Sequence, residues 1–154
     1  EQIDQAKRNE LLVRVDVIPP SLVLAQGANE SAWGTSRFAK QGNNFFGQWC
    51  YSKGCGLVPL QRNAGTKHEV RKFDSPQQSV GAYIFNLDTG RVYSSIRKQR
   101  ANARANGTNP SGYDLASGLT KYSERGDEYV KEIKSMISYN KLVSKYDTKF
   151  WQEL

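Results

Sequence analysis

Residues 18–50 read IPPSLVLAQGANESAWGTSRFAKQGNNFFGQWC, and their pattern decides much of the predicted fold. The two prolines favour an extended approach, because a residue that precedes proline avoids the helical region. Small and apolar residues then recur at near-helical spacing and predict a helix over residues 20–33: Leu22, Ala25, Ala28 and Ala32. Gly34 is a helix stop signal, and Ser36 can cap a short helix that runs through Ala39. The Gly-, Asn- and aromatic-rich residues 41–56 are predicted to form a loop.

Outward from this stretch, helical patterns dominate the chain. They cover residues 3–15, 75–90, 92–103, 114–118 and 127–140. Residues 57–73 predict a β-hairpin, with strands at 57–62 and 67–73, a turn at 63–65, and Pro59 favouring an edge position. The predicted fold class is therefore α+β, mainly α, with one small β-hairpin. No repeat or linker interrupts the chain, so residues 1–154 are predicted to be a single domain.

The composition of the chain suggests an anionic binding partner but does not decide between several classes of partner. The chain has 154 residues, 38% of them hydrophobic, and no apolar run near the ~20 residues that a membrane span needs. A net charge of +7 suggests a nucleic acid, an anionic membrane surface or an anionic wall polymer. One basic cluster predicts either a solvated helix face or a surface for a polyanion; its members are Arg91, Arg97, Lys98, Arg100 and Arg104.

Several chemistries are excluded by the residues present. The chain has two cysteines, Cys50 and Cys55, and one histidine, His68, which is too few ligands for a zinc site. No metal is therefore predicted. Neither a Ser-His-Asp arrangement nor a phosphate-binding glycine loop occurs, and no cofactor is predicted. The two cysteines are interpreted as a local disulfide of an exported protein, with two cytosolic thiols as the alternative.

Glu30 stands out among the carboxylates on physical grounds. It falls in the last turn of the predicted apolar helix, at the negative end of the helix dipole. No cation lies among its helical neighbours, so its pKa should rise toward that of a general acid. Gly27 and Gly34, at i−3 and i+4, have no side chains, which leaves room for a ligand to approach Glu30. The alternative is an ordinary solvent-facing helix glutamate.

Three segments, in order, resemble one known family. The first combines Ala25-Gln26, Glu30, Trp33-Gly34 and the run Asn43-Asn44-Phe45-Phe46-Gly47. The others are KFDSPQQSVGAYI at 72–84 and LTKYSERGDEYVKEI at 119–133. Together they resemble the bacterial endo-β-N-acetylglucosaminidases of glycoside hydrolase family 73, with Bax-type proteins nearest. The resemblance covers about residues 15–142.

This resemblance implies a lysozyme-like fold and a peptidoglycan hydrolase. The expected reaction cleaves the β-1,4 bond after N-acetylglucosamine, and Glu30 matches the family's catalytic acid. The implied partner is the glycan strand of peptidoglycan, for a monomer that binds no nucleic acid. The expected location is the periplasm or cell envelope, with an export signal outside these residues.

The resemblance also assigns further site residues. Glu69, the only acidic residue of the predicted hairpin, would act as base or stabilise charge on the sugar; otherwise it is an exposed partner of Arg71 or Lys67. Tyr122 matches a tyrosine that faces the acid, or is a half-buried core residue. Binding of substrate is expected from Asn44, Phe46 and Trp49, although Phe46 could instead be core, and Trp33 is predicted to pack. Attack by the substrate's own acetamide is an alternative to a base-activated water.

Three rival functions remain from the sequence. A lytic transglycosylase shares the single acid but closes an anhydro ring. A non-catalytic peptidoglycan-binding module would not depend on the acidity of Glu30. A nucleic-acid-binding domain is suggested only by the charge, since no matching motif occurs.

Overall fold

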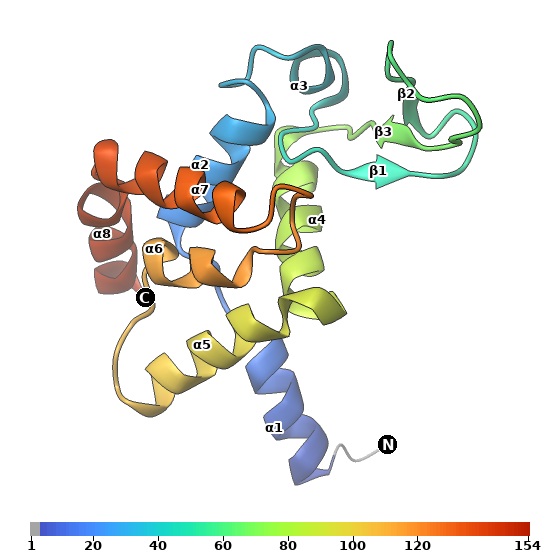
Figure 1. The fold of residues 1–154 in the computed structure, drawn as a ribbon. Coiled ribbons are helices and arrows are strands. Elements are labelled where there is room, and N and C mark those ends of the chain that lie inside the picture. Colours follow the sequence, from blue (N-terminus) through green and yellow to red (C-terminus); the bar gives the residue numbers. More distant parts are fainter. Residues whose placement is uncertain (1–3) are drawn as a thin grey trace. The chain divides into compact units, whose positions relative to one another are not determined.

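The computed structural model describes residues 4–154, which form two compact units. Of the described residues, unit 1 comprises residues 4–25 and 84–154, and unit 2 comprises residues 26–83. Two helices contribute residues to both units: α2 (Pro20–Glu30) and α4 (Pro76–Thr89). The mainly helical α+β class is confirmed (Figure 1). The single-domain assignment stays a prediction.

Unit 1 is helical. Its first helix, α1 (Gln5–Arg14), agrees with the pattern at residues 3–15, of which Ile3 lies outside the described residues. The remaining elements are η1 (Arg91–Tyr93), α5 (Ser94–Ala105), α6 (Gly112–Leu115), η2 (Ala116–Gly118), α7 (Asp127–Tyr139), η3 (Val143–Asp147) and α8 (Thr148–Glu153). The predicted helices at residues 92–103, 114–118 and 127–140 correspond to α5, α6 with η2, and α7, whereas η3 and α8 had no sequence prediction. Figure 1 shows α6 and α7 side by side, as their contacts require.

The core of unit 1 is mainly aliphatic, with the buried rings of Tyr93 and Tyr129, and small residues let its segments approach closely. Its fully buried members include Leu22, Leu87, Ile96, Leu115, Leu119, Ile133 and Ile137. A side chain at Gly112 would collide with Ser21, and one at Gly118 with Ile96. Asp147 then ties the C-terminal segment to the start of α2, because its buried carboxylate accepts from Ser21 N at 2.8 Å and Gly112 N at 3.0 Å.

The predicted basic surface is wrong for two of its five members, Arg97 and Arg100, which are buried, whereas Arg91, Lys98 and Arg104 are exposed. Arg100 is 1% exposed; it pairs with Asp88 at 2.8 Å and donates to the carbonyls of Arg14 and Asp16. Arg97 is buried and donates to two backbone carbonyls, and Arg104 pairs with Asp16. The guanidiniums of Arg97 and Arg100 satisfy carbonyls where helices end, so these two members of the cluster are internal.

Unit 2 holds a short helix and a small sheet. Helix α3 (Arg37–Gly42) is capped as predicted, since the Ser36 hydroxyl accepts from Ala39 N at 3.1 Å. The strands are β1 (Trp49–Cys50), β2 (Gly56–Leu57) and β3 (Glu69–Arg71). They form an antiparallel sheet in the order β1-β3-β2.

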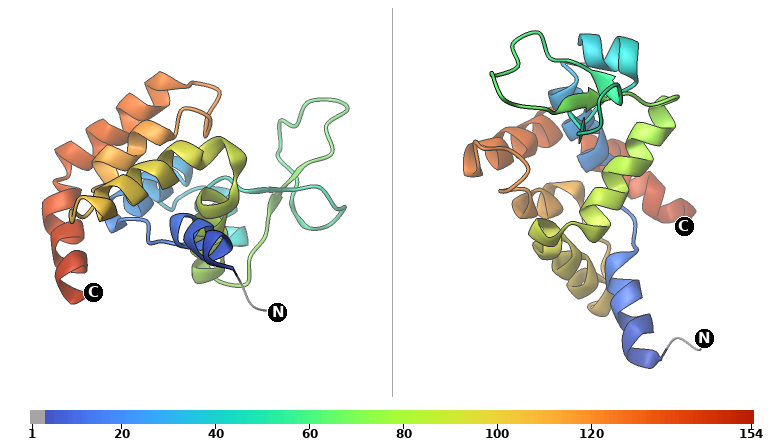
Figure 2. Two further views of the ribbon diagram at one scale, coloured as in Figure 1. Left: turned by 90° about the horizontal axis from the view of Figure 1, so that it is seen from below. Right: turned by 90° about the vertical axis from the view of Figure 1, so that its right-hand side faces the viewer.

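The hairpin prediction is partly wrong. Only Leu57 of the predicted first strand is paired, and residues 58–68 form the long loop seen in Figure 2. Pro59 has no N–H to donate, and the Val58 carbonyl accepts from the Arg37 guanidinium at 2.7 Å instead of a strand. The second partner of β3 comes from the predicted loop, where Trp49 pairs with Val70 and Cys50 with Glu69.

Candidate active site

Glu30 is the last residue of α2, as the macrodipole argument required, and its side chain is half-buried. The chain then makes a left-handed turn through Ala32, Trp33 and Gly34, whose φ angles are 50°, 57° and 75°. Left-handed conformations of non-glycine residues are strained and concentrate at functional sites. Ser31 braces the turn, because its buried hydroxyl donates to Gly27 O at 2.6 Å and accepts from Gly34 N at 2.8 Å.

The glycines around Glu30 have different neighbours from those expected. A Cβ at Gly27 would lie 3.4 Å from the Phe46 ring, so Phe46 fills the space that sequence reasoning left for a ligand. Gly47, at φ 68°, is the glycine that borders the acid: a Cβ there would lie 3.4 Å from Glu30 Oε2. The run at residues 43–47 therefore brings a bare, exposed backbone position beside the carboxylate.

Asn44 organises the loop between α3 and β1. Its buried side chain donates to the carbonyls of Gln48 and Arg71, at 2.9 Å each. Its Oδ1 accepts from Phe46 N at 3.3 Å and Gln48 N at 3.2 Å. Four bonds from one amide hold the loop against β3. In this conformation the Asn44 side chain stabilises the loop, and its contact with substrate stays a prediction.

Phe46 has a comparable internal position. It is 3% exposed and stacks on Tyr83, with ring centroids 4.1 Å apart. Tyr83 in turn donates its hydroxyl hydrogen bond to Gln26, which is fully buried. These contacts agree with the alternative that Phe46 is a core residue, and its role in substrate binding stays a prediction.

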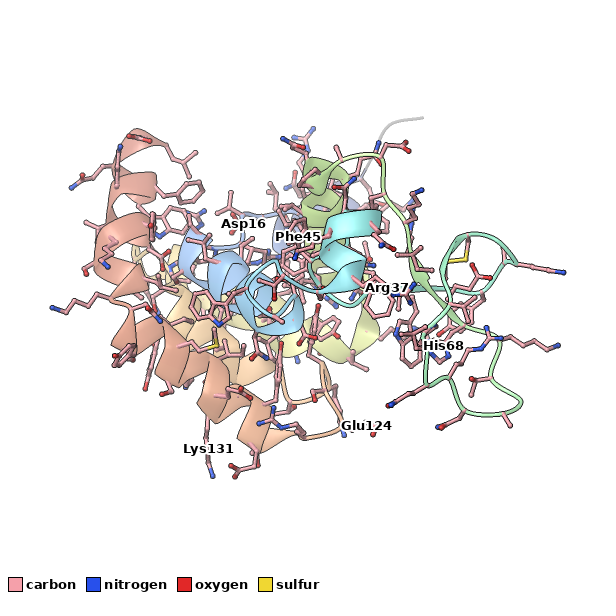
Figure 3. All side chains as sticks on the ribbon, turned by 90° about the horizontal axis from the view of Figure 1, so that it is seen from above. Asp16, Arg37, Phe45, His68, Glu124 and Lys131 are labelled. Carbon is pink, nitrogen blue, oxygen red and sulfur yellow. A yellow bond between two sulfur atoms is a disulfide. The ribbon has the colours of Figure 1, made fainter. Side chains whose placement is uncertain are left out.

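Trp49 is exposed and paired with the single histidine. Its indole is 55% exposed, and the His68 ring stacks on it at 3.8 Å between centroids. Figure 3 labels His68 on the extended loops of unit 2, where the disulfide is also drawn. An exposed aromatic surface of this kind can stack on the C–H face of a sugar. The prediction that Trp33 packs is wrong, because the residue is 69% exposed, which favours the alternative that it contacts a ligand.

Glu69 is held by backbone amides. Its side chain is buried, and its Oε1 and Oε2 accept from Gly54 N at 2.9 Å and Gly56 N at 2.8 Å. These two hydrogen bonds, with the nearby charges of Arg62 and Lys53, hold the pKa of Glu69 below its ordinary value. The alternative of an exposed Glu69 paired with Arg71 or Lys67 is wrong, because the side chain is buried and the ion pairs of residues 4–154 do not include it. Glu69 is ionised at neutral pH.

Tyr122 belongs to unit 1, in the turn that precedes α7. Its ring stacks on Tyr129 with centroids 5.6 Å apart, and lies 6.1 Å from that of Tyr93. The side chain is half-buried. Its expected position opposite Glu30 stays a prediction.

A metal has one candidate ligand group in the described part of the chain. Atoms of Cys50, Cys55 and Glu69 lie within 4.8 Å of one another. The two sulfurs are bonded to each other in a disulfide, and the carboxylate is occupied by two amides. With the thiolates consumed, this cluster does not fit a metal ion.

Sequence reasoning missed the polar residues that tie the loop to α4. Ser79 is fully buried; its hydroxyl accepts from Phe45 N at 3.2 Å and donates to Gln48 Oε1 at 3.1 Å. Gln48 Nε2 donates to Ser79 O at 2.7 Å. A polar residue on the apolar face of a predicted helix was the available signal, both for Ser79 and for Gln26.

Comparison with known proteins places the chain among the glycoside hydrolases. A family described as mannosyl-glycoprotein endo-beta-N-acetylglucosaminidase, the glucosaminidase family, matches residues 7–142. The chain belongs to this family. It is also similar to Protein bax of Escherichia coli (strain K12), with 38% identity over 132 residues. That alignment covers 86% of this chain and 46% of the relative, so the chain spans about half of the relative's length. No solved structure matches.

Proposed function

We propose that this protein hydrolyses the β-1,4 bond after N-acetylglucosamine in peptidoglycan, with Glu30 as general acid. The observation that carries the proposal is the position of Glu30. It is a half-buried carboxylate at the end of α2, beside the bare backbone of Gly47, in a chain of the glucosaminidase family. In the reaction Glu30 protonates the leaving glycosidic oxygen as positive charge grows on the sugar ring.

Glu69 supplies negative charge in this mechanism. Its lowered pKa keeps it ionised at neutral pH, which suits a carboxylate that stabilises an oxocarbenium ion or accepts a proton from water. Tyr122 is proposed to position the water or the substrate's acetamide. Trp49 is proposed to stack on a sugar, and Asn44 and Phe46 to maintain the loop that carries Gly47 and Trp49.

The proposed substrate sets the proposed place of action. Peptidoglycan glycan strands are anionic polymers of the cell envelope, and the net charge of +7 favours their binding. A disulfide between Cys50 and Cys55 agrees with an oxidising compartment such as the periplasm. No helix in residues 4–154 has the length and apolar character needed to cross a membrane.

Replacing Glu30 with Gln tests the proposal. The variant keeps the shape of the side chain and removes its proton, so digestion of purified peptidoglycan should slow by about 10²–10⁴-fold, the usual contribution of a general acid. Binding to insoluble peptidoglycan should be retained. Glu153→Gln, at an exposed position in α8, is the matched control and should keep full activity.

The digestion products decide the bond and the reaction type. Mass spectrometry should find reducing N-acetylglucosamine ends. Anhydro ends in their place would identify a lytic transglycosylase. An E30Q variant with unchanged activity would refute the role of Glu30, and wild-type protein that binds but never cleaves would identify a binding module.

A further inference from the structure

The Cys50–Cys55 disulfide and Glu69 form one structural device in unit 2. Cys50 is directly opposite Glu69 in the β1–β3 pairing. The disulfide closes a loop between two cysteines that are five residues apart in the sequence. The backbone N–H groups of Gly54 and Gly56, at the end of this loop, donate to the Glu69 carboxylate. We call the disulfide, the two glycine amides and the Glu69 carboxylate the latch.

Each part of the latch is well defined. Glu69 is 6% exposed, and each of its oxygens accepts one backbone N–H, at 2.9 Å and 2.8 Å. Hydrogen bonds of this kind to a charged acceptor are stronger than neutral ones. The amides of Gly54 and Gly56 flank Cys55 and converge on the one carboxylate, while the Cys55 amide donates to Ser52 O at 3.1 Å. The latch therefore stabilises Glu69 in its ionised form and in one orientation.

The two glycines are required by the backbone itself. Gly54 has a φ of 82°, which other residues adopt only with strain, and no atom lies within 4 Å of a Cβ placed there. At Gly56 a side chain would collide with the Val70 carbonyl of β3. The amides can face Glu69 only while this loop keeps its shape, and the disulfide is the covalent bond that closes it.

We propose that the Cys50–Cys55 disulfide positions Glu69 through the latch, and that reduction of this bond by a dithiol frees the carboxylate and lowers the activity of the site. Two electrons and two protons pass from the dithiol to the S–S bond, which becomes two thiols, while the reductant becomes a disulfide. Cys50 and Cys55 are positioning residues in this proposal, because they act through Glu69. The effect on activity rests on the proposed function, whereas the effect on Glu69 does not.

The titration of Glu69 tests the latch without any assay of activity. The carboxyl carbon of Glu69 is followed by ¹³C NMR as a function of pH in the oxidised protein, in the protein reduced with dithiothreitol, and in the C50S/C55S variant. The pKa of Glu69 should rise toward its ordinary value of about 4.3 in both disulfide-free forms. Arg62 lies outside the disulfide loop and is present in all three forms, so its charge does not account for the difference. An unchanged pKa would overturn the proposal.

Gly54→Ala tests the same contact with the cysteines intact. Alanine strains the backbone at φ 82° without a collision, so the amide should move away from Glu69 and the pKa should rise. Gly65→Ala is the matched control: its φ is 86°, its surroundings are equally open, and it makes no contact with Glu69. The control should leave the pKa of Glu69 unchanged; an equal shift in both variants would refute the latch.

Hydrolysis of peptidoglycan by the oxidised and the reduced protein is measured alongside these titrations. Reduction should lower kcat on peptidoglycan by about 10-fold, within the ~10²-fold that a displacement of about 1 Å can cost. It should also shift the acid limb of the kcat pH profile upward. A raised pKa with unchanged kcat would overturn the functional part of the proposal. Absence of hydrolysis in the oxidised wild type would refute the proposed function and leave the titration to decide the latch.

Discussion

Replacing Asn44 with Ala should destabilise unit 2 by about 3 kcal/mol. The change removes both 2.9 Å bonds from Asn44 Nδ2, so the Arg71 carbonyl loses this donor, whereas the Gln48 carbonyl keeps its bond from Arg71 N at 2.9 Å. An unmet buried polar group costs ~1–3 kcal/mol. The two longer bonds to Oδ1 add less, because hydrogen bonds weaken with distance.

Chemical and thermal unfolding measure this loss. Urea unfolding followed by circular dichroism gives the free energy, and the midpoint temperature should fall by ~6–12 °C, at ~2–4 °C per kcal/mol for a chain of this size. Asn63→Ala, at an exposed position of the loop between β2 and β3, is the control and should change stability by less than ~0.5 kcal/mol.

The result that refutes this reasoning is a small loss with altered binding. If Asn44→Ala unfolds within ~1 kcal/mol of the wild type but binds peptidoglycan more weakly, the four bonds are not structural. Asn44 would then be a direct substrate contact, as the family resemblance first suggested. Amide hydrogen exchange supplies a second check, since Gln48 N and Phe46 N should lose protection in the variant if Asn44 holds the loop.

Three further predictions address other parts of the molecule. Arg100→Ala should cost about 3–5 kcal/mol in urea unfolding, because it leaves Asp88 charged and buried without its partner; a loss below ~1 kcal/mol would contradict this. Phe46→Ala should lower the free energy of unfolding by about 3–5 kcal/mol, because Phe46 is buried. Trp49→Ala should keep the melting temperature and raise KM for peptidoglycan by about 10-fold, because Trp49 is exposed. The reverse pattern would make Phe46 the residue that contacts the sugar. Because bonds from Gly54 and Gly56 lower the pKa of Glu69, its ionised form stabilises the fold above the ordinary glutamate pKa, and this contribution disappears as the pH falls through the lowered value. The stability advantage of the wild type over Glu69→Gln, from unfolding curves at several pH values, should therefore shrink toward low pH; a constant difference would argue against the two bonds.

Local patterns predicted the helices well. Apolar spacing and capping signals identified α1, α2, α3, α4 and α7 near their observed bounds, because these signals act over three or four residues of one segment. The end of α2 came three residues earlier than predicted. The left-handed turn at Ala32 and Trp33 is unusual for those residue types, and no local signal announces it.

The sheet and the charged residues were predicted less well. Sequence reasoning placed β3 correctly but paired it with the wrong length of chain, since strand partners are selected by non-local hydrogen bonds. The basic cluster on α5 looked like a surface because guanidiniums usually are exposed. The carbonyls that Arg97 and Arg100 satisfy come from distant segments, which the sequence of α5 does not reveal.

The sequence by itself determined the family, the helix that carries Glu30 and the place of that carboxylate at the helix end. Those features follow from three short motifs in order along the chain and from backbone bonds four residues apart. Only the tertiary structure decided what surrounds the carboxylates: Gly47 beside Glu30, Phe46 over Gly27, and two glycine amides on Glu69. Such neighbours are brought together by loop geometry and a disulfide across segments that share no periodicity. The environment of an acid, and hence its charge, is therefore a property of the folded chain.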